Sequence, residues 1–468
     1  MTTTSEFHIL DRRPGGGLPT VADTPRPRRF YVETWGCQMN ELDSQRMSAQ
    51  LMQQGILPTP EVGDADVILL NSCSVREKAA QKAYSRLGEY RLLKRQRPHL
   101  MIGFCGCVAQ QEGESAVSRV PDLDFVVGPG RVGELAEILE RRRSTGKPVV
   151  ATGFPDASVR NYDLDSLARE GTYKGMVTII EGCNKKCTFC IVPSTRGPEQ
   201  SRPLRDVLSE VEHLLDLGFV EIELLGQTVN HWVCPETGVD FAVLLDRVAR
   251  LGMKRLRFVT SYPRDFSQPM VDQFARHENL SPYLHLPVQS ASNRMLKLMG
   301  RGYEIDLYDR LIASLRLARP GIALSSDFII GFPGETEEDH RATLDLIERV
   351  RYAQVFAFKY SPRPGTAAPR LKLDAVPDDV ADRRLQEVFA VQGEIQRELN
   401  RELEGSEHEV LVTQWGRKPG TQTGRTACHR LIHFEYGAQP IPLGSLTRVR
   451  VAKGLPHSLL GELTERVA

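Results

Sequence analysis

The chain has 468 residues, and its 60 basic and 60 acidic side chains give a formal net charge of zero at pH 7. This length exceeds one compact core and predicts two or three domains, while the balanced charge neither favours nor excludes a nucleic-acid partner. Nine cysteines are too few for a disulfide scaffold, and no apolar run is long enough to cross a bilayer. With no apolar signal-peptide core near the N-terminus, we expect a cytoplasmic protein.

The first 28 residues are polar and rich in Pro, Gly and Thr, and they predict a disordered tail. Residues 29–145 alternate short strands with helices, which is typical of a parallel-sheet α/β domain. The expected strands are 30–34, 67–70, 100–104 and 125–127, and the expected helices are 41–54, 76–95 and 132–143.

Four cysteines of this region stand where expected strands end. Cys37 follows the first strand, Cys73 follows the second, and Cys105 and Cys107 follow the third. Because functional groups gather beyond the carboxyl ends of parallel strands, these thiols are expected to converge on one site. The alternative is that they are small residues of the core. We choose Cys107, which follows Gly106, as the third thiol of the site and expect Cys105 to pack in the core.

Residues 146–173 lack periodicity and predict a linker between domains. Strand–helix alternation resumes over 174–403 and predicts a partial or full barrel of parallel strands. The expected strands are 176–180, 220–225, 256–260, 283–286, 323–330 and 354–360, and the expected helices are 204–217, 241–251, 269–276, 293–299, 307–318, 337–350 and a helix-rich stretch at 376–403.

Three further cysteines, Cys183, Cys187 and Cys190, follow the first strand of this region with the spacing C-x3-C-x2-C. Thiolates at such spacing can bind one soft metal centre. Three thiols leave one iron of a [4Fe-4S] cluster open, whereas a structural zinc site needs four protein ligands. The spacing is similar to that of the radical S-adenosylmethionine (SAM) superfamily, which implies a [4Fe-4S] cluster whose open iron binds SAM. A zinc knuckle is the alternative.

Loops at the ends of the central strands supply candidates for SAM contacts, which are Phe189, Gly226, Gln227, Asn230, Asp327 and Gly331. The amides of Gln227 and Asn230 would suit the amino-acid end of SAM, and Asp327 could accept hydrogen bonds from ribose hydroxyls. Gly331 would allow close backbone approach, and Phe189 could pack on adenine. For each of these residues a structural role in its own turn or loop is the alternative.

Arg196 and Arg264 could bind phosphates or the SAM carboxylate, although most arginines lie on a solvated face. His231 and Cys234 are assigned no ligand role. Residues 404–468 predict a small antiparallel β-barrel with strands at 408–415, 421–425, 431–436, 447–452 and 459–463. Basic and aromatic side chains gather in this segment as in RNA-binding barrels, although an ordinary solvated surface would look similar.

From about residue 29 to the C-terminus the chain resembles the radical SAM methylthiotransferases, which join an N-terminal cluster domain, a radical SAM barrel and a C-terminal TRAM domain. The sequence Gly36-Cys37-Gln38-Met39-Asn40 is similar to the branch that acts on tRNA, as are residues 261–266, 285–290 and 359–366. The resemblance implies a second [4Fe-4S] cluster on Cys37, Cys73 and Cys107. Cys105 is a departure from the family pattern.

The activity implied by the resemblance replaces the C2 hydrogen of N6-dimethylallyladenosine, beside the tRNA anticodon, by a methylthio group. One cluster would reduce SAM to a 5′-deoxyadenosyl radical, and the other would present methylated sulfur to adenine C2. Both clusters would then face one cleft, with an external electron donor and a monomeric chain. The alternatives are methylthiolation of threonylcarbamoyladenosine in tRNA or of a ribosomal-protein aspartate, and a non-catalytic zinc-stabilised RNA-binding protein.

Overall fold

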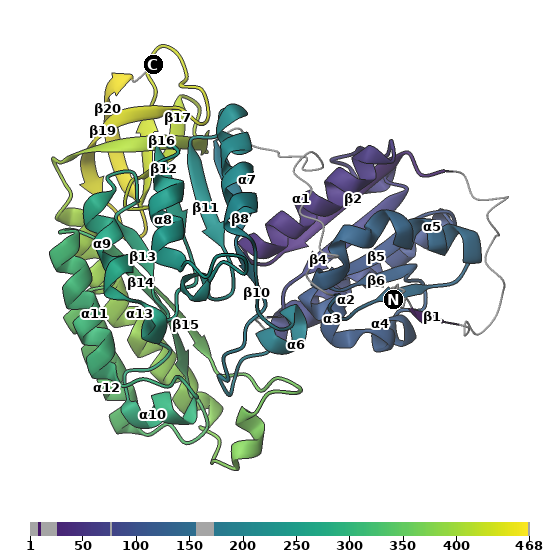
Figure 1. The fold of residues 1–468 in the computed structure, drawn as a ribbon, viewed down its shortest axis with the longest axis horizontal. Coiled ribbons are helices and arrows are strands. Elements are labelled where there is room, and N and C mark those ends of the chain that lie inside the picture. The colour runs from purple at the N-terminus through teal and green to yellow at the C-terminus, as the bar shows by residue number, and fades with distance from the viewer. Residues whose placement is uncertain (1–7, 11–25, 75–76, 156–172, 467–468) are drawn as a thin grey trace. The chain divides into compact units, whose positions relative to one another are not determined.

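The computed structural model describes residues 8–10, 26–74, 77–155 and 173–466 (Figure 1). They form two compact units. The first unit contains the described residues up to 155 together with Glu181–Lys185 and Ile191–Gln200, and the second contains 173–180, Lys186–Cys190 and 201–466. Between residues 180 and 201 the chain therefore changes unit at four points, which are 180/181, 185/186, 190/191 and 200/201.

The first unit is built on a seven-stranded sheet with the order β1-β7-β6-β5-β4-β2-β3. All neighbouring strands are parallel except β1 and β7, which are antiparallel. Strands β4 to β7 are buried along their whole length, as expected where helices cover both faces of a sheet. The strands are β1 His8–Ile9, β2 Arg29–Trp35, β3 Leu57–Pro58, β4 Val67–Ser72, β5 Met101–Gly106, β6 Phe125–Val127 and β7 Val149–Ala151.

Two apolar cores hold the helices of this unit against the sheet, one on each face. Side chains of α1 and α5 pack into one core, and those of α2, α3 and α4 pack into the other. Figure 1 shows this three-layer arrangement. The helices are α1 Gln38–Gln53, α2 Glu77–Gln96, α3 Cys107–Glu112, α4 Glu114–Arg119 and α5 Leu135–Thr145, with 3-10 turns η2 Val62–Asp64 and η3 Pro129–Glu134.

The four strands predicted for this unit are confirmed as β2, β4, β5 and β6, but the shortest elements were missed. β1 lies in the predicted disordered tail, where only 8–10 and 26–28 are described, and its two residues pair with β7. β7 lies in the predicted linker, of which 156–172 fall outside the described residues. β1 and β7 lie in segments without hydrophobic periodicity, so no sequence pattern marked them as strands.

The second unit contains six parallel strands in two sheets of three, ordered β12-β11-β8 and β13-β14-β15. A parallel bridge pairs Leu256 of β12 with Leu280, which lies three residues before β13. In the described residues β8 and β15 each pair on one side only, so the barrel is partial rather than closed. The strands are β8 Lys174–Thr178, β11 Glu221–Leu225, β12 Arg255–Phe258, β13 Tyr283–His285, β14 Ala323–Ile330 and β15 Gln354–Lys359.

The helices that cover this partial barrel carry apolar stripes at helical spacing. In α7, Val207, Val211 and Leu214 face one large core together with the strand side chains. The helices are α7 Leu204–Asp216, α8 Phe241–Ala249, α9 Gln268–Arg276, α10 Asn293–Leu298, α11 Ile305–Ala318, α12 Glu337–Val350 and α13 Asp378–Arg401, with 3-10 turns η5 Val229–His231, η6 Pro263–Asp265 and η7 Ala368–Leu371. The six predicted strands and the seven predicted helical segments of this region are confirmed, with bounds that shift by a few residues.

The C-terminal strands of this unit close into a small barrel with the order β16-β17-β18-β20-β19. The sequence predicted an antiparallel barrel, but β18 and β20 pair in parallel. A ring of five strands cannot alternate direction at every pair, so closure requires one parallel pair. The strands are β16 Glu407–Trp415, β17 Thr421–Thr426, β18 Leu431–Glu435, β19 Leu446–Gly454 and β20 Leu459–Arg466.

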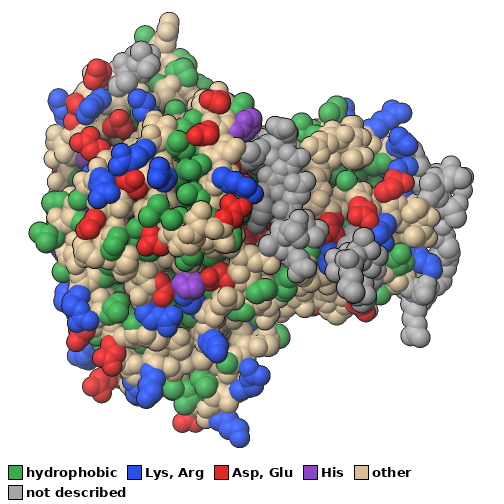
Figure 2. Space-filling model, viewed as in Figure 1, with side chains coloured by type: hydrophobic (Ala, Val, Ile, Leu, Met, Phe, Trp, Pro, Cys, Tyr) green, Lys and Arg blue, Asp and Glu red, His purple; other side chains and the backbone are tan. Residues whose placement is uncertain are grey.

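Charged side chains are mixed over the surface of the second unit. On the face shown in Figure 2, basic and acidic groups are interspersed there rather than gathered by sign. This mixture agrees with the equal counts of the two charges in the sequence. None of the described helices is both long and apolar enough to cross a membrane.

Candidate iron–sulfur and SAM sites

Three thiols of the first unit meet at the carboxyl end of its sheet. Cys37 follows β2, Cys73 follows β4, and Cys107 begins α3 directly after β5. These three strands are neighbours, and their last residues pair level with one another. The Cys73 thiol hydrogen-bonds with the thiols of both Cys37 and Cys107. The structure thus brings together the three cysteines that the sequence predicted to converge.

Close backbone packing fixes this end of the sheet. Gly106 has φ +91°, and a Cβ at this position would lie 2.5 Å from the carbonyl oxygen of Ser72, so only glycine fits between β5 and β4. The buried amides of Asn71 and Asn40 hydrogen-bond each other at 3.1 Å, and Asn71 also donates to the Asn40 carbonyl oxygen at 2.9 Å. This amide pair ties the start of α1 to the end of β4.

The thiol site favours negatively charged sulfur. The hydrogen bond from Cys73 lowers the pKa of Cys37 to about 6 and that of Cys107 to about 7, and the nearby charge of Arg196 acts in the same direction. The two flanking thiols raise the pKa of Cys73 itself. Because cysteine binds metals as the thiolate, the residues present suit an iron–sulfur cluster.

Cys105 is not part of the thiol contact. It lies in the fully buried core with Phe125 and Val127. Burial, together with the charge of Asp43, raises the pKa of its thiol. Cys105 therefore fills the core, as the sequence analysis expected.

A buried group of charges surrounds the thiols on the side of α1. Arg196, the last residue of α6 Val192–Arg196, is 5% exposed and forms an ion pair with Asp43 at 2.7 Å. Arg46 forms a second ion pair with Glu181 at 3.1 Å. A solvated surface position for Arg196 was the most common expectation from sequence, and the structure contradicts it. No local pattern marks this residue, because Asp43 lies more than 150 positions earlier in the chain.

Cys183 is held by backbone contacts within the first unit. Its N–H donates to the carbonyl oxygen of Gly197 at 3.1 Å. The preceding residue, Gly182, has φ +75°, and a Cβ there would lie 2.5 Å from the same carbonyl oxygen. The loop can therefore take this path only with glycine at position 182.

Cys187 and Cys190 belong to the second unit. The N–H of Cys190 donates to the carbonyl oxygen of Cys187 at 3.2 Å, and a guanidinium nitrogen of Arg301 lies 3.6 Å from the Cys187 sulfur. Arg301 is buried, with its guanidinium carbon 4.3 Å from the centre of the Tyr262 ring and 5.6 Å from that of Tyr303. The sequence analysis missed Arg301. Its flanking glycines, both with positive φ, were the available signal of a tight turn.

Among the described residues no three Cys, His, Asp or Glu side chains are arranged to hold a single metal ion directly. A [4Fe-4S] cluster instead binds its thiolates through different irons, so its ligands need not surround one ion. The thiol contacts around Cys73 and the shared loop of Cys183, Cys187 and Cys190 are therefore the observations that bear on a larger cluster.

Three of the predicted SAM contacts, Phe189, Gly226 and Asn230, pack against or hydrogen-bond with other residues of the protein. Phe189 is half-buried and packs against a small apolar cluster that contains Met295 and Phe332. Asn230 donates to the carbonyl oxygen of Tyr262 at 2.9 Å and accepts from its N–H at 2.7 Å, so both ends of its amide are already used. Gly226 packs against Ile180 with no room for a side chain, and its neighbour Gln227 is half-buried.

Asp327 remains accessible to a ligand. Its side chain is 31% exposed, and its carboxylate lies 3.4 Å from Nε2 of His285. The other ring nitrogen of His285 hydrogen-bonds Oγ of Ser325 at 2.9 Å. These side chains form a polar row across β13 and β14. The partly exposed carboxylate of Asp327 can accept hydrogen bonds from the hydroxyl groups of a ligand.

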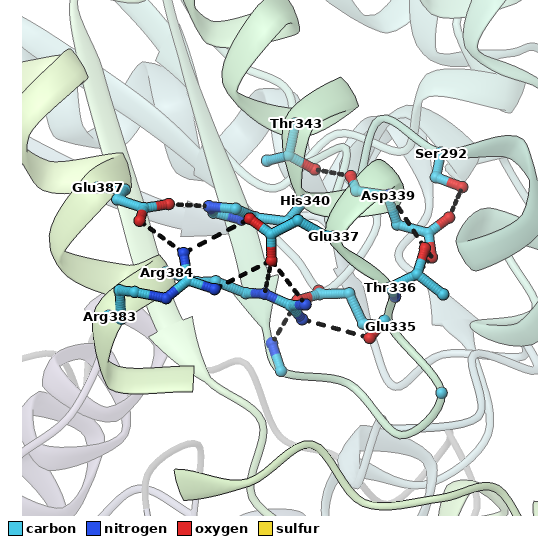
Figure 3. A network of polar contacts seen from close by, with 12 residues as sticks. Ser292, Glu335, Thr336, Glu337, Asp339, His340, Thr343, Arg383, Arg384 and Glu387 are labelled. Atoms are coloured by element: carbon cyan, nitrogen blue, oxygen red, sulfur yellow. Dashed lines mark hydrogen bonds and ion pairs between the residues drawn. The ribbon is translucent and has the colours of Figure 1, made fainter. Parts of the chain in front are cut away.

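The loop after β14 is fastened to α13. The Gly331 N–H donates to Glu335 at 3.1 Å, and the Glu335 carboxylate accepts from Arg384 at 2.8 Å (Figure 3). Gly331 also lies against α13, where an added Cβ would be 2.8 Å from Ala381. Thr336 and Asp339 form a capping box at the start of α12. These contacts fix the loop after β14, which contains the predicted SAM contact Gly331, against α13.

Arg264 lies on the surface and pairs with Asp265 at 3.2 Å, so the solvated alternative describes it. Cys234 is buried and accepts from the Leu204 N–H at 3.4 Å, which is a helix-end contact. His231 ends η5 and is half-buried. No ligand role was predicted for His231 or Cys234.

A half barrel of parallel strands with a three-cysteine loop after its first strand defines a radical SAM enzyme. The chain matches the family model of the radical SAM superfamily over residues 177–347 and that of the uncharacterized protein family UPF0004 over residues 29–128. A similar solved structure is that of the radical SAM methyltransferase TsrM from Kitasatospora setae, with a TM-score of 0.53 and 15% identity over 85% of this chain and 78% of that chain. At this identity the likeness concerns the fold.

Near full-length relatives are much more similar. One from Cereibacter sphaeroides is 44% identical over 93% of this chain and 98% of its own length, and one from Ruegeria sp. is 44% identical over 94% and 99%. A relative from Burkholderia multivorans is 44% identical over 93% and 97%. All three are named tRNA-2-methylthio-N(6)-dimethylallyladenosine synthase, and the chain belongs to this family.

Proposed function

We propose that the chain replaces the C2 hydrogen of N6-dimethylallyladenosine, next to the anticodon of tRNA, by a methylthio group in a radical SAM reaction. Membership of the synthase family supports this function. The observation that carries it in the structure is the contact of three thiols from separate strand ends in the first unit. The same chain also contains the three-cysteine loop. One enzyme would thus have two sets of cluster ligands.

Each set has its own role. Cys183, Cys187 and Cys190 would hold a [4Fe-4S] cluster, and Arg301 would stabilise the thiolate of Cys187 by a charge-assisted hydrogen bond. Reductive cleavage of SAM at this cluster supplies the radical that an unreactive C2–H bond requires. Cys37, Cys73 and Cys107 would hold a second [4Fe-4S] cluster beside the buried Arg196, and that cluster would supply the chemistry of methylthio transfer.

Alanine substitutions separate the two half-reactions. Changing Cys183, Cys187 or Cys190 to Ala should abolish production of 5′-deoxyadenosine, because the SAM-binding cluster is lost. Changing Cys37, Cys73 or Cys107 to Ala should leave SAM cleavage intact and stop thiolation of tRNA. Cys105→Ala is the matched control, because it removes a thiol two residues from Cys107 that takes no part in the thiol contact, and it should preserve both reactions.

The measurements are 5′-deoxyadenosine yield, iron content after anaerobic purification, and mass analysis of tRNA nucleosides from cells that lack the protein. The proposal expects iron for two four-iron clusters and 2-methylthio-N6-dimethylallyladenosine that disappears without the protein. Zinc in place of iron, or an unchanged nucleoside profile, would refute it. Loss of a different methylthio nucleoside would keep the chemistry and correct the substrate.

The C-terminal barrel would contact the tRNA, as a TRAM domain does. A hollow of about 1320 Å³ on this barrel is lined by Trp415, Arg417, Lys418 and His433. Trp415 is 57% exposed and meets Tyr436 edge to face at 6.2 Å between ring centres. An exposed indole beside two cations can stack a base and neutralise phosphates.

We also infer that the enzyme is a cytoplasmic monomer that takes electrons from an external donor. Nine free cysteines, two sets of which would serve as ligands, favour a reducing compartment. Size-exclusion chromatography coupled to light scattering tests the monomer, and a dimer mass at micromolar concentration would refute it.

A further inference from the structure

A buried arginine near the thiols of Cys37, Cys73 and Cys107, here called the auxiliary site, has a terminal nitrogen without a hydrogen-bond partner. Arg196 is 5% exposed, and its terminal nitrogen Nη1 is buried without a hydrogen-bond partner among the described residues. The other terminal nitrogen, Nη2, is used by the ion pair with Asp43 at 2.7 Å. Buried donors are rarely left unpaired, because the desolvation of an unpaired group is costly.

The donors of Arg196 belong to the thiol site. Arg196 ends α6, which packs against α3, and Cys107 is the first residue of α3. The guanidinium charge acts on the sulfurs of both Cys37 and Cys107. Asp43, which pairs with Arg196, lies in α1 six residues after Cys37. The arginine is therefore fixed between the two helices that follow thiols of the site.

The same short segment also holds a cysteine of the other set. Gly197, the residue after Arg196, accepts the backbone hydrogen bond from Cys183. Glu181, two residues before Cys183, pairs with Arg46 of α1. All of these contacts lie within the first unit. A displacement of Arg196 would therefore affect Cys183 as well as Cys37 and Cys107.

We propose that Arg196 is a positioning residue of the auxiliary site and donates hydrogen bonds to sulfur of the [4Fe-4S] cluster held by Cys37, Cys73 and Cys107. The inference rests on the proposed function, because it requires a cluster at these thiols. Three thiolates and the cluster sulfides bring negative charge into a buried site, and a fixed cation with free donors offsets it. Hydrogen bonds to sulfur and nearby positive charge favour the reduced cluster.

The experiment measures the reduction potential of the auxiliary cluster alone. The full chain carries Cys183→Ala, Cys187→Ala and Cys190→Ala, so that only the auxiliary cluster is present, and Arg196 is kept or changed to Lys or Gln. Arg196→Gln should lower the potential by at least about 59 mV, which is a tenfold change for one electron. Arg196→Lys keeps the charge but not the planar donor fork, and its potential should lie between the two.

The matched control is Arg142→Gln. Arg142 is 8% exposed in the same unit and pairs with Asp124 at 2.8 Å. Asp124 directly precedes β6, at the amino end of the sheet, whereas the thiols follow the carboxyl ends of the strands. It should lower thermal stability about as much as Arg196→Gln and leave the potential of the cluster unchanged.

Equal potentials in the Arg196, Lys and Gln proteins would overturn the inference, as would an equal shift in the Arg142→Gln control. Loss of iron from Arg196→Gln, with retention in Arg142→Gln at equal thermal stability, would support it, whereas equal loss of iron from both would count against it. Absence of any cluster in the protein that keeps Arg196 would instead refute the proposed function. The two failures are therefore distinct.

Discussion

The buried pair of Arg384 and Glu335 should control how often the loop after β14 opens. Both side chains are almost fully buried, 6% and 4% exposed, with their nitrogen and oxygen 2.8 Å apart. Changing Arg384 to Met leaves the Glu335 carboxylate buried without its cation. Loss of one partner of a buried ion pair typically costs about 3–5 kcal/mol. Because each 1.4 kcal/mol is about tenfold in an equilibrium, local opening should become at least about a hundred times more frequent.

The neighbouring Arg383 provides a matched control on the same helix. It pairs with Glu337 at 3.0 Å, but the two side chains are 48% and 53% exposed. Exposed ion pairs contribute up to about 1 kcal/mol, so Arg383→Met should change opening by about fivefold or less. Figure 3 shows both arginines beside the same acidic residue. The two variants therefore differ mainly in burial.

Amide hydrogen exchange of peptides from 328–340 and 378–392 measures the opening directly. The Arg384→Met protein should exchange at least about a hundredfold faster in both peptides, and adding Glu335→Gln should restore most of the protection, since no charge is then left buried. SAM affinity measured alongside should fall with Arg384→Met and recover in the double variant. Equal exchange in the Arg384→Met and Arg383→Met proteins would show that burial does not determine the strength of this pair.

Three further outcomes follow from local geometry. Gly182→Ala should lose iron and SAM cleavage, because its Cβ meets a carbonyl oxygen at φ +75°, whereas Gly55→Ala has φ +76° but open space and should keep both; equal iron contents would contradict the steric account. Burial among arginines lowers the pKa of His429, so folding stability should decrease as the pH falls below about 6.5, where the unfolded chain takes up a proton first. His429→Asn should flatten that pH dependence in thermal melts, because asparagine tolerates the backbone φ of +69° at this position. Trp415→Ala should weaken tRNA binding by about 1–3 kcal/mol, whereas Phe389→Ala, which removes a 44% exposed ring from α13, should leave the affinity unchanged in filter binding.

The sequence predicted the strands and the auxiliary thiols well because both follow from simple local rules. A buried strand such as β4 is a continuous apolar run, and its carboxyl end must lie beside those of β2 and β5. Cys37, Cys73 and Cys107 could therefore be placed together before the structure was known. Cys105 could be separated from them because it lies two residues before Cys107, nearer the expected strand.

Other features depend on contacts that no local pattern contains. The burial of Arg196 requires Asp43 from a distant helix, and the use of the Asn230 amide by Tyr262 arises only after the loops fold together. Short pieces such as β1 exist because β7 offers an edge. The parallel pairing of β18 and β20 follows from closing an odd ring. Each of these required the three-dimensional arrangement.

Because the polypeptide passes repeatedly between its two units, the protein cannot be divided into fragments simply at one position of the sequence. A fragment that starts at residue 173 would look like a self-sufficient radical SAM module in a sequence diagram. It would carry α6 and Cys183 away from Asp43, Arg46 and Phe154, whose ring packs on Gly197. Such a fragment would leave Arg196 and Glu181 without Asp43 and Arg46, their ion-pair partners, so it would lack contacts that hold the segment around Cys183.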